Sequence, residues 1–282
     1  MQSGRTYLLA GGGTGGHLYP GIAVAHALRS AEPEARVIFL TTNRDLDADL
    51  VSREGFEQIP QPVRPFAGNP LRWPTFWNAW RASVRQAARA IHKSAAAAVL
   101  GLGGYAAGPP VVAAKYAGVR RAILNPDAVP GRANRFLARR VQAVFLQWEA
   151  SRRHFTPAVE CRTVGCPIRA AFRNADRQRG LSRFGLDAAK RTLLVTGASQ
   201  GARTINEALQ RVWPRFARAR ADWQLLHLTG HRDEAATRSA YERAGAADSA
   251  TVVGFTHEMA DALAAADIVI SRAGASTLAE LT

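Results

Sequence analysis

The stretch AGGGTGGHLYPG, residues 10–21, decides how the first half of this chain folds. It follows an apolar run at 7–10 and precedes a helical apolar pattern that begins at Ile22. The order strand, glycine turn and helix places backbone N–H groups and a helix N-terminus around an anion. Three of its glycines also fit the dinucleotide pattern G-x-G-x-x-G, but such folds need an acidic residue at the end of the second strand, and residues 36–43 carry none. We therefore predict a phosphate-binding loop of another kind, with His17 at its edge.

Composition narrows the class of protein. The 282 residues include 37 Lys plus Arg and 22 Asp plus Glu, a net charge of +15. Such an excess favours polyanionic partners, namely nucleic acid, acidic lipid headgroups or phosphorylated substrates, although a generally arginine-rich composition gives the same charge. No segment is apolar for long enough to span a bilayer, and the first residues do not resemble a cleavable signal peptide, so we expect a cytosolic chain.

Strand-like apolar runs alternate with helical patterns, which predicts an α/β fold of parallel sheets covered by helices on both faces. The pattern starts a second time at 192–196, where a buried strand precedes a glycine turn and a helix. We predict two Rossmann-like domains, 1–165 and 166–282, that face a cleft with ligands at the carboxyl ends of the strands. The chain ends in a helix that has just begun, so the second domain is expected to be truncated. The predicted strands are 5–10, 36–41, 57–60, 97–100, 120–124, 143–147, 162–164, 192–196, 223–228, 250–253 and 267–270.

Several polar features are candidates for chemistry. A helix N-terminus disfavours the protonated form of His17, which suits a general base, although a capping or packing histidine is the alternative. The Asp-x-Asp run at 45–49 resembles a metal-binding motif, but residues two apart on a helix point to opposite sides, so we assign it to helix initiation and predict no metal site. The turn at 197–201 is a second candidate anion loop, to which Ser199 adds a hydroxyl. The turn at 101–105 is expected to bring a third stretch of backbone close to a ligand in the same cleft.

An aromatic stripe follows within residues 71–81. Its tryptophans recur at helical spacing, so they share one face of a helix. A core face is the usual explanation of such a stripe, whereas the surrounding arginines favour an interfacial helix that meets anionic lipid, and both interpretations stay open. The residues assigned to membrane contact are Arg72, Trp73, Phe76, Trp77, Trp80 and Arg81.

Five motifs together resemble one family. They are GGTGGH (12–17) with PG (20–21), GGY (103–105) with GP (108–109), PIR (167–169), SQGAR (199–203) with Asn206, and RAGA (272–275) running to Glu280. The chain is similar to the MurG family, the undecaprenyldiphospho-muramoylpentapeptide β-N-acetylglucosaminyltransferases, which are GT-B glycosyltransferases of peptidoglycan synthesis. The motifs occur in the expected order over the whole chain, and related GT-B enzymes share only one or two of them.

The resemblance implies a GT-B fold and an inverting transfer of N-acetylglucosamine. The donor is UDP-GlcNAc, and the acceptor is the C4 hydroxyl of the muramoyl sugar of lipid I, which becomes lipid II. It implies no metal and no cofactor. It also implies a peripheral position on the cytoplasmic face of the inner membrane, with the aromatic stripe against the anionic surface.

Site residues carry over from the family by position. Arg169 and Ser199 are implied to contact the donor, Ser199 near its diphosphate, and the backbone of Thr256 to read the uracil. The loop that faces the sugar and the acceptor diphosphate matches Thr14, Gly15 and Gly16, with His17 as the base. The next wall of the donor pocket matches Ala275, Ser276, Thr277, Leu278, Ala279 and Glu280, the last of which holds the ribose hydroxyls.

Two departures from the family concern the site. The family's sugar-contacting asparagine is replaced by Asp127 unless Asn125 takes its place, and a carboxylate accepts hydrogen bonds but cannot donate as an amide does. A later glutamine contact and the closing C-terminal helix of the family lie beyond Thr282, so a chain that stopped there is expected to be weakly active or inactive.

Two rival functions remain. One is another GT-B transferase of a UDP-sugar, acting on a glycolipid or natural product. The other is a basic nucleic-acid-binding protein, which predicts salt-sensitive binding. The glycine loops argue against the second rival, so nucleic acid is not an expected partner.

Overall fold

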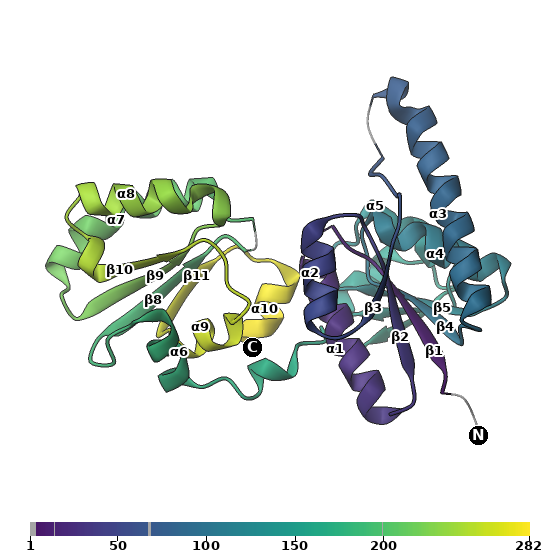
Figure 1. Cartoon of the computed structure of the whole chain (residues 1–282), viewed down its shortest axis with the longest axis horizontal. Coiled ribbons are helices and arrows are strands. Elements are labelled where there is room, and N and C mark those ends of the chain that lie inside the picture. Colours follow the sequence, from purple (N-terminus) through teal and green to yellow (C-terminus); the bar gives the residue numbers. More distant parts are fainter. Residues whose placement is uncertain (1–3, 14, 67–68, 199) are drawn as a thin grey trace. The chain divides into compact units, whose positions relative to one another are not determined.

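The computed structural model describes residues 4–13, 15–66, 69–198 and 200–282. The chain forms two compact units, Met1–Arg169 and Ala170–Thr282, and the expected change of domain at residue 165 falls just before this boundary. Each unit contains a parallel β-sheet flanked by helices (Figure 1). The predicted α/β fold with two Rossmann-like sheets is therefore confirmed, and each predicted strand is present with ends that differ by at most two residues.

The sheet of unit 1 has the strand order β3-β2-β1-β4-β5-β6-β7, and every pair of neighbours is parallel. The central strands are continuous apolar runs because both faces of the sheet are covered. The chain leaves β1 toward β2 on one side and reaches β4 on the other, so the switch in strand order lies beside the carboxyl end of β1. The strands are β1 (Thr6–Ala10), β2 (Arg36–Thr41), β3 (Glu57–Pro60), β4 (Ala98–Gly101), β5 (Arg120–Asn125), β6 (Ala143–Leu146) and β7 (Glu160–Thr163).

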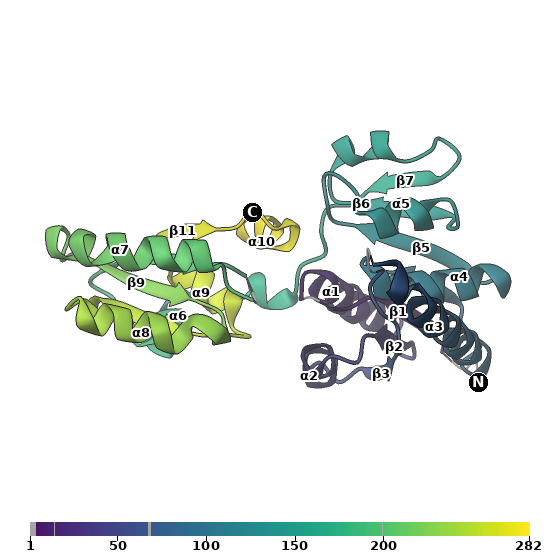
Figure 2. The same cartoon turned by 90° about the horizontal axis from the view of Figure 1, so that it is seen from above.

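A different set of helices covers each face of this sheet. Leu9 and Phe39 pack with buried residues of α1 and α2, whereas Leu8 and Ile38 pack with α3, α4 and α5. Figure 2 shows α1 on one side of β1 and α3 and α4 on the other. The helices are α1 (Gly15–Ala31), α2 (Asp45–Arg53), α3 (Trp73–Lys93), α4 (Gly108–Tyr116) and α5 (Arg132–Ala138), with short 3₁₀ helices η1 (Pro70–Arg72), η2 (Tyr105–Ala107) and η3 (Glu149–His154).

The first helix begins earlier than the sequence predicts. The apolar helical pattern that begins at Ile22 predicts a helix near residues 20–30. In the structure α1 begins at Gly15 and Pro20 lies inside the helix. The predicted start is therefore wrong, and Gly16 and His17 belong to the first helical turn, where backbone N–H groups have no intrahelical partner.

Unit 2 has a four-stranded sheet of order β10-β9-β8-β11. Val195 and Leu225 pack with Trp213 of α7 and Tyr241 of α8, whereas Leu194 packs with α6 and α9 on the opposite face. Figure 1 shows these two pairs of helices above and below the sheet. The elements are η4 (Ala170–Phe172), α6 (Arg177–Phe184), β8 (Arg191–Thr196), α7 (Arg203–Ala219), β9 (Trp223–Leu228), η5 (His231–Asp233), α8 (Glu234–Arg243), η6 (Ala247–Ser249), β10 (Ala250–Val253), α9 (Met259–Ala265), β11 (Ile268–Ser271) and α10 (Ala275–Leu281).

Candidate functional site

The first glycine loop is held by the segment that leads into α2. The Gly13 amide donates to both carboxylate oxygens of Asp47, at 3.0 and 2.9 Å. Arg44 Nη1 donates to the Gly13 carbonyl oxygen at 2.7 Å, so both backbone polar groups of Gly13 are bound. Gly12 has φ +150°, and a Cβ there would lie 2.3 Å from Asp47 Oδ2. Only glycine lets the loop approach the carboxylate so closely.

Asp47 is the site residue whose role was missed from the sequence. Its carboxylate is buried and also accepts hydrogen bonds from the amide and hydroxyl of Thr42, at 3.1 and 2.5 Å. Assigning the acidic run to helix initiation is correct for the start of α2 at Asp45 but incomplete for Asp47. A signal was present in the sequence, because Asp47, Leu50 and Val51 recur at the spacing of one buried helical face.

His17 lies against the third glycine turn. Its half-buried imidazole faces the backbone of Gly103 and Gly104, which have φ +104° and +71°. A Cβ on Gly103 would lie 2.9 Å from His17 Cδ2, and one on Gly104 would lie 3.2 Å from Cε1. The two glycines thus leave room for the ring, and they connect the loop after β4 with the loop after β1.

The surroundings keep His17 neutral. Burial lowers the pKa of its imidazole below the usual 6.5, and the nearby carboxylates of Asp127 and Asp47 and a hydrogen bond with the Gly12 carbonyl oppose that shift without cancelling it. The N-terminal position in α1 disfavours the imidazolium further. A neutral imidazole is the protonation state that a general base requires at neutral pH.

Asn125 and Asp127 lie in different surroundings. Asn125 is buried, its Nδ2 donates to the Asp127 carbonyl oxygen at 2.7 Å, and its Oδ1 accepts from Asn134 Nδ2 at 3.0 Å. Both ends of the amide therefore hold the turn after β5. Asp127 is exposed and lies close enough to His17 to affect its pKa.

Arg169 ends unit 1 beside the first helix. Its guanidinium lies over the Tyr19 ring, 4.0 Å from the centroid, which is the geometry of a cation–π contact. A Cβ on Gly15 would lie 3.0 Å from Tyr19 Cε2, so Tyr19 bridges Arg169 and the start of α1. Thr14 of this loop and Ser199 of the second loop lie outside the described residues.

The second glycine turn rests on the end of β9. A Cβ on Gly201, which has φ +70°, would lie 1.9 Å from the Thr229 carbonyl oxygen, and one on Gly230 would lie 2.7 Å from the Gln200 carbonyl oxygen. Side chains at these two glycines would push the turn away from the sheet. The position of the segment Thr229–Gly230 therefore determines the position of the turn.

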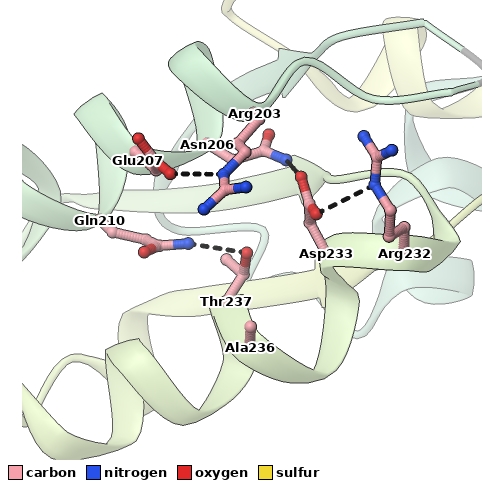
Figure 3. A pocket seen from close by; sticks show the side chains of 8 residues that line it. All are labelled: Arg203, Asn206, Glu207, Gln210, Arg232, Asp233, Ala236 and Thr237. Atoms are coloured by element: carbon pink, nitrogen blue, oxygen red, sulfur yellow. Dashed lines mark hydrogen bonds and ion pairs between the residues drawn. The ribbon is translucent and has the colours of Figure 1, made fainter.

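A buried chain of hydrogen bonds fixes that segment, and part of it is seen in Figure 3. Asn206 Nδ2 donates to the Thr229 carbonyl oxygen at 2.9 Å and to Asp233 Oδ2 at 3.0 Å. Asn206 Oδ1 lies 3.1 Å from His227 Nε2, and His227 Nδ1 lies 3.0 Å from the Tyr241 hydroxyl. Burial lowers the pKa of His227 to about 4 and raises that of Tyr241, so both groups are neutral at pH 7.

The other residues expected to contact the donor lie at the same edge of the unit 2 sheet. Thr256 follows β10, and its hydroxyl accepts a hydrogen bond from the Glu258 amide at 3.0 Å. The segment from Ala275 to Glu280 forms most of α10, which begins three residues after β11. Because carboxyl ends of parallel strands meet at one edge, these segments adjoin the second glycine turn.

The aromatic stripe divides between two environments. Trp73 and Trp77 are 44% and 49% exposed, on the turns of α3 that extend beyond the rest of unit 1 in Figure 1. Trp80 is half-buried, and a Cβ on Gly108 would lie 2.6 Å from its Cη2. Its ring centroid lies 6.3 Å from that of Phe136. The three tryptophans keep the spacing of one side of α3, but their burial differs along the helix because α4 and α5 cover only part of it.

Comparison with known proteins now identifies the family. Residues 7–146 match the glycosyltransferase family 28 N-terminal domain, and residues 192–282 match the family's C-terminal domain. The chain belongs to glycosyltransferase family 28.

Curated relatives in this family share one name, UDP-N-acetylglucosamine–N-acetylmuramyl-(pentapeptide) pyrophosphoryl-undecaprenol N-acetylglucosamine transferase. The relative from Sorangium cellulosum is 41% identical over 281 residues, which cover 98% of the chain and 67% of the relative. The relative from Clavibacter sepedonicus is 40% identical over 285 residues, covering 98% of the chain and 73% of the relative.

Solved structures agree on the architecture. MurG from Acinetobacter baumannii is 25% identical with a TM-score of 0.65, over 97% of the chain and 73% of that protein. A UDP-GlcNAc 2-epimerase from Neisseria meningitidis gives a TM-score of 0.70 at 11% identity, over 95% of the chain and 77% of the epimerase, which is a likeness of fold alone.

Replacing Asp47 by Asn should loosen the first glycine loop of this family 28 chain. The amide keeps the shape of the carboxylate but turns one acceptor into a donor, so Gly13 or Thr42 loses a buried partner, at a cost of roughly 1–3 kcal/mol. Denaturant unfolding measures the loss, and hydrogen exchange at the Gly13 amide locates it. Asp45→Asn is the matched control, because Asp45 is exposed at the start of the same helix. Unchanged exchange at Gly13 in the Asp47 variant would contradict the assignment.

His227 should make unit 2 less stable in mild acid. The unfolded chain binds a proton at this histidine near pH 6.5, whereas the folded chain does so only near pH 4. Stability from this group is therefore complete above pH 6.5 and falls by up to about 3 kcal/mol as the pH decreases to 4.

The measurement is the unfolding free energy of wild type and His227→Gln between pH 7 and 4. The variant is expected to start less stable but to lose less stability on acidification. His231→Gln, at an exposed histidine of the same unit, should keep the wild-type slope. A wild-type slope in His227→Gln would show that another group titrates.

Proposed function

We propose that the chain transfers N-acetylglucosamine from UDP-GlcNAc to the C4 hydroxyl of the muramoyl sugar of lipid I, giving lipid II with inversion. The observation that carries this proposal is the 41% identity, over 98% of the chain, to a relative named as the transferase of a pyrophosphoryl-undecaprenol acceptor. The arrangement of the glycine loops and His17 supports it.

His17 is the proposed general base. Its ring lies at the N-terminus of α1 with a lowered pKa, so it accepts the acceptor's proton as the C4 oxygen attacks the sugar. The glycine turn before α7 is proposed to bind the UDP diphosphate, because helix N-termini and turn amides stabilise negative charge that develops on a leaving group.

The proposed reaction uses no metal ion. The carboxylates with Asp-x-Asp spacing have other partners, since Asp47 accepts hydrogen bonds from the glycine loop and Asp49 pairs with Arg53 at 2.7 Å. Arginine side chains, rather than a metal ion, are proposed to supply the positive charge that the anionic substrates need. In this view the +15 net charge serves anionic substrates and lipids rather than nucleic acid.

The tip of α3 is proposed to bind the cytoplasmic face of the inner membrane. Leu71 of η1 and Trp73 and Trp77 of α3 are exposed there, close in sequence to the exposed Arg72 and Arg81. Exposed aromatics beside arginines fit an interface where apolar side chains enter the lipid and cations meet anionic headgroups. No helix among the described residues has the length and apolar character to cross a bilayer.

Calorimetric titration with UDP-GlcNAc and UDP, with NAD as control, tests the donor assignment. Saturable binding of the two uridine ligands alone is expected. Product analysis after incubation with UDP-GlcNAc and a muramoyl-pentapeptide diphospholipid then tests the transfer. A different acceptor used in its place would favour another GT-B transferase, and salt-sensitive binding of DNA without nucleotide-sugar binding would overturn the proposal.

Replacing His17 by Ala should lower turnover by about two to four orders of magnitude and leave UDP binding nearly intact. In wild type the acidic limb of the kcat/KM profile should lie below pH 6.5, because the pKa of His17 is lowered. His26→Ala is the matched control, since His26 is an exposed histidine of the same helix paired with Glu54. Equal turnover in His17→Ala and wild type would remove His17 from the mechanism.

A further inference from the structure

A groove lies beside the half-buried side of α3. It has a volume of about 620 Å³, within the range of about 300–1,000 Å³ that ligand pockets occupy. Its walls come from α3, α4, α5 and the short helix η2, and most of them are apolar. The lining residues used below are Tyr105, Val112, Tyr116, Arg132, Ala133 and Phe136.

The groove adjoins the exposed tip of α3, and Trp77 belongs to both. Phe76 and Trp80 are half-buried on its wall, whereas Leu71 at the tip is 87% exposed and does not line it. A flat bilayer surface meets the protruding side chains of the tip first, whereas a concave site suits a ligand that it can surround. The recess therefore fits a narrow apolar ligand better than it fits a membrane surface.

One end of the groove meets the candidate catalytic loop. Tyr105 lines the groove, and a Cβ on Gly13 would lie 3.5 Å from both Cε1 and the hydroxyl of Tyr105. The two residues before Tyr105 are the glycines that face the His17 ring. A ligand in the groove would thus have one end beside the first glycine loop.

Cationic groups lie on the α5 side of the groove. Arg132 is exposed, and Arg140 stacks on Phe136 with its guanidinium 3.7 Å from the ring centroid. An apolar channel with arginines beside it complements an amphiphile that has an apolar chain and an anionic head.

We propose that this groove binds the isoprene units next to the diphosphate of the polyprenyl acceptor. This rests on the proposed function, whose acceptor class comes from the relatives' pyrophosphoryl-undecaprenol. The bound segment leaves the bilayer and lies along Phe76, Trp80 and Phe136, which places the diphosphate at the glycine loop. The exposed tip of α3 binds the membrane, and the groove binds the chain.

The test uses soluble prenyl diphosphates of two, three and four isoprene units, titrated calorimetrically below their micelle concentrations, with inorganic diphosphate as the head alone. Each added unit should tighten binding by about tenfold or more until the groove is full, because every buried methylene adds to the affinity. An affinity no greater than that of inorganic diphosphate at every chain length would overturn the proposal.

Two matched substitutions locate the binding. Ala133→Phe fills the groove and should weaken the four-unit ligand at least about tenfold while leaving inorganic diphosphate unchanged. Ala82→Phe makes the same change on the exposed side of α3 and should leave both affinities at wild-type values. Equal effects of the two substitutions would also overturn the proposal. Circular dichroism melts of both variants check that each is folded.

A third comparison separates chain binding from membrane binding. The double substitution Leu71→Ser with Trp73→Ser should weaken sedimentation with anionic phospholipid vesicles but not the affinity for the four-unit ligand. Ala133→Phe should instead weaken the affinity for the four-unit ligand and leave sedimentation with the vesicles unchanged. If both variants lose vesicle binding and neither changes ligand affinity, the whole face is a membrane surface and the groove proposal is wrong. Tight ligand binding without any transferase activity would instead leave the groove intact and remove the proposed reaction.

Discussion

The hydrogen bonds between the Asp47 carboxylate and the Gly13 amide are the contact on which the first candidate site depends. A buried carboxylate beside an anion-binding loop is unfavourable unless its charge is compensated, and the amides of Gly13 and Thr42 do so together with the nearby Arg44. The Gly13 amide is therefore committed to Asp47. In the proposed function, donors for a substrate phosphate therefore come from the first turn of α1, where backbone N–H groups have no intrahelical partners.

The two glycine turns follow equivalent strands but are held by different chemistry. In unit 1 a charged side chain from the next helix binds the turn directly. In unit 2 the turn packs against the Thr229 carbonyl, and Asn206 binds that carbonyl from the side of α7. In the second arrangement the groups that contact the turn are neutral, since the pKa of His227 is low and Asn206 is an amide, and the Asp233 carboxylate joins only through Asn206.

The parallel sheets could be predicted because their strands are apolar runs buried on both faces, a pattern that local sequence carries by itself. Details of the site depend on contacts between distant segments. The apolar pattern from Ile22 indicated a helix near residues 20–30, but α1 begins at Gly15, two residues after the amide that Asp47 binds. Asp47 already had a local explanation in the helix dipole, which concealed its burial. Asn125 was an alternative to Asp127 as a sugar contact, and its hydrogen bond from Asn134, nine residues later, could not be foreseen from the local sequence.

The aromatic stripe of α3 lies in two different environments. The second half of this helix is anchored in the unit 1 core, where Ser83, Ala87 and Ile91 are buried, whereas its first turns have no sheet beneath them. Large apolar side chains left in water there, such as Trp73, forgo the stabilisation that burial gives, which is how interaction surfaces differ from a core. About two turns further on, Trp80 has α4 and α5 for partners. The same helical spacing therefore gives an exposed aromatic surface at one end and a wall of a groove at the other, because the neighbouring helices cover only part of α3.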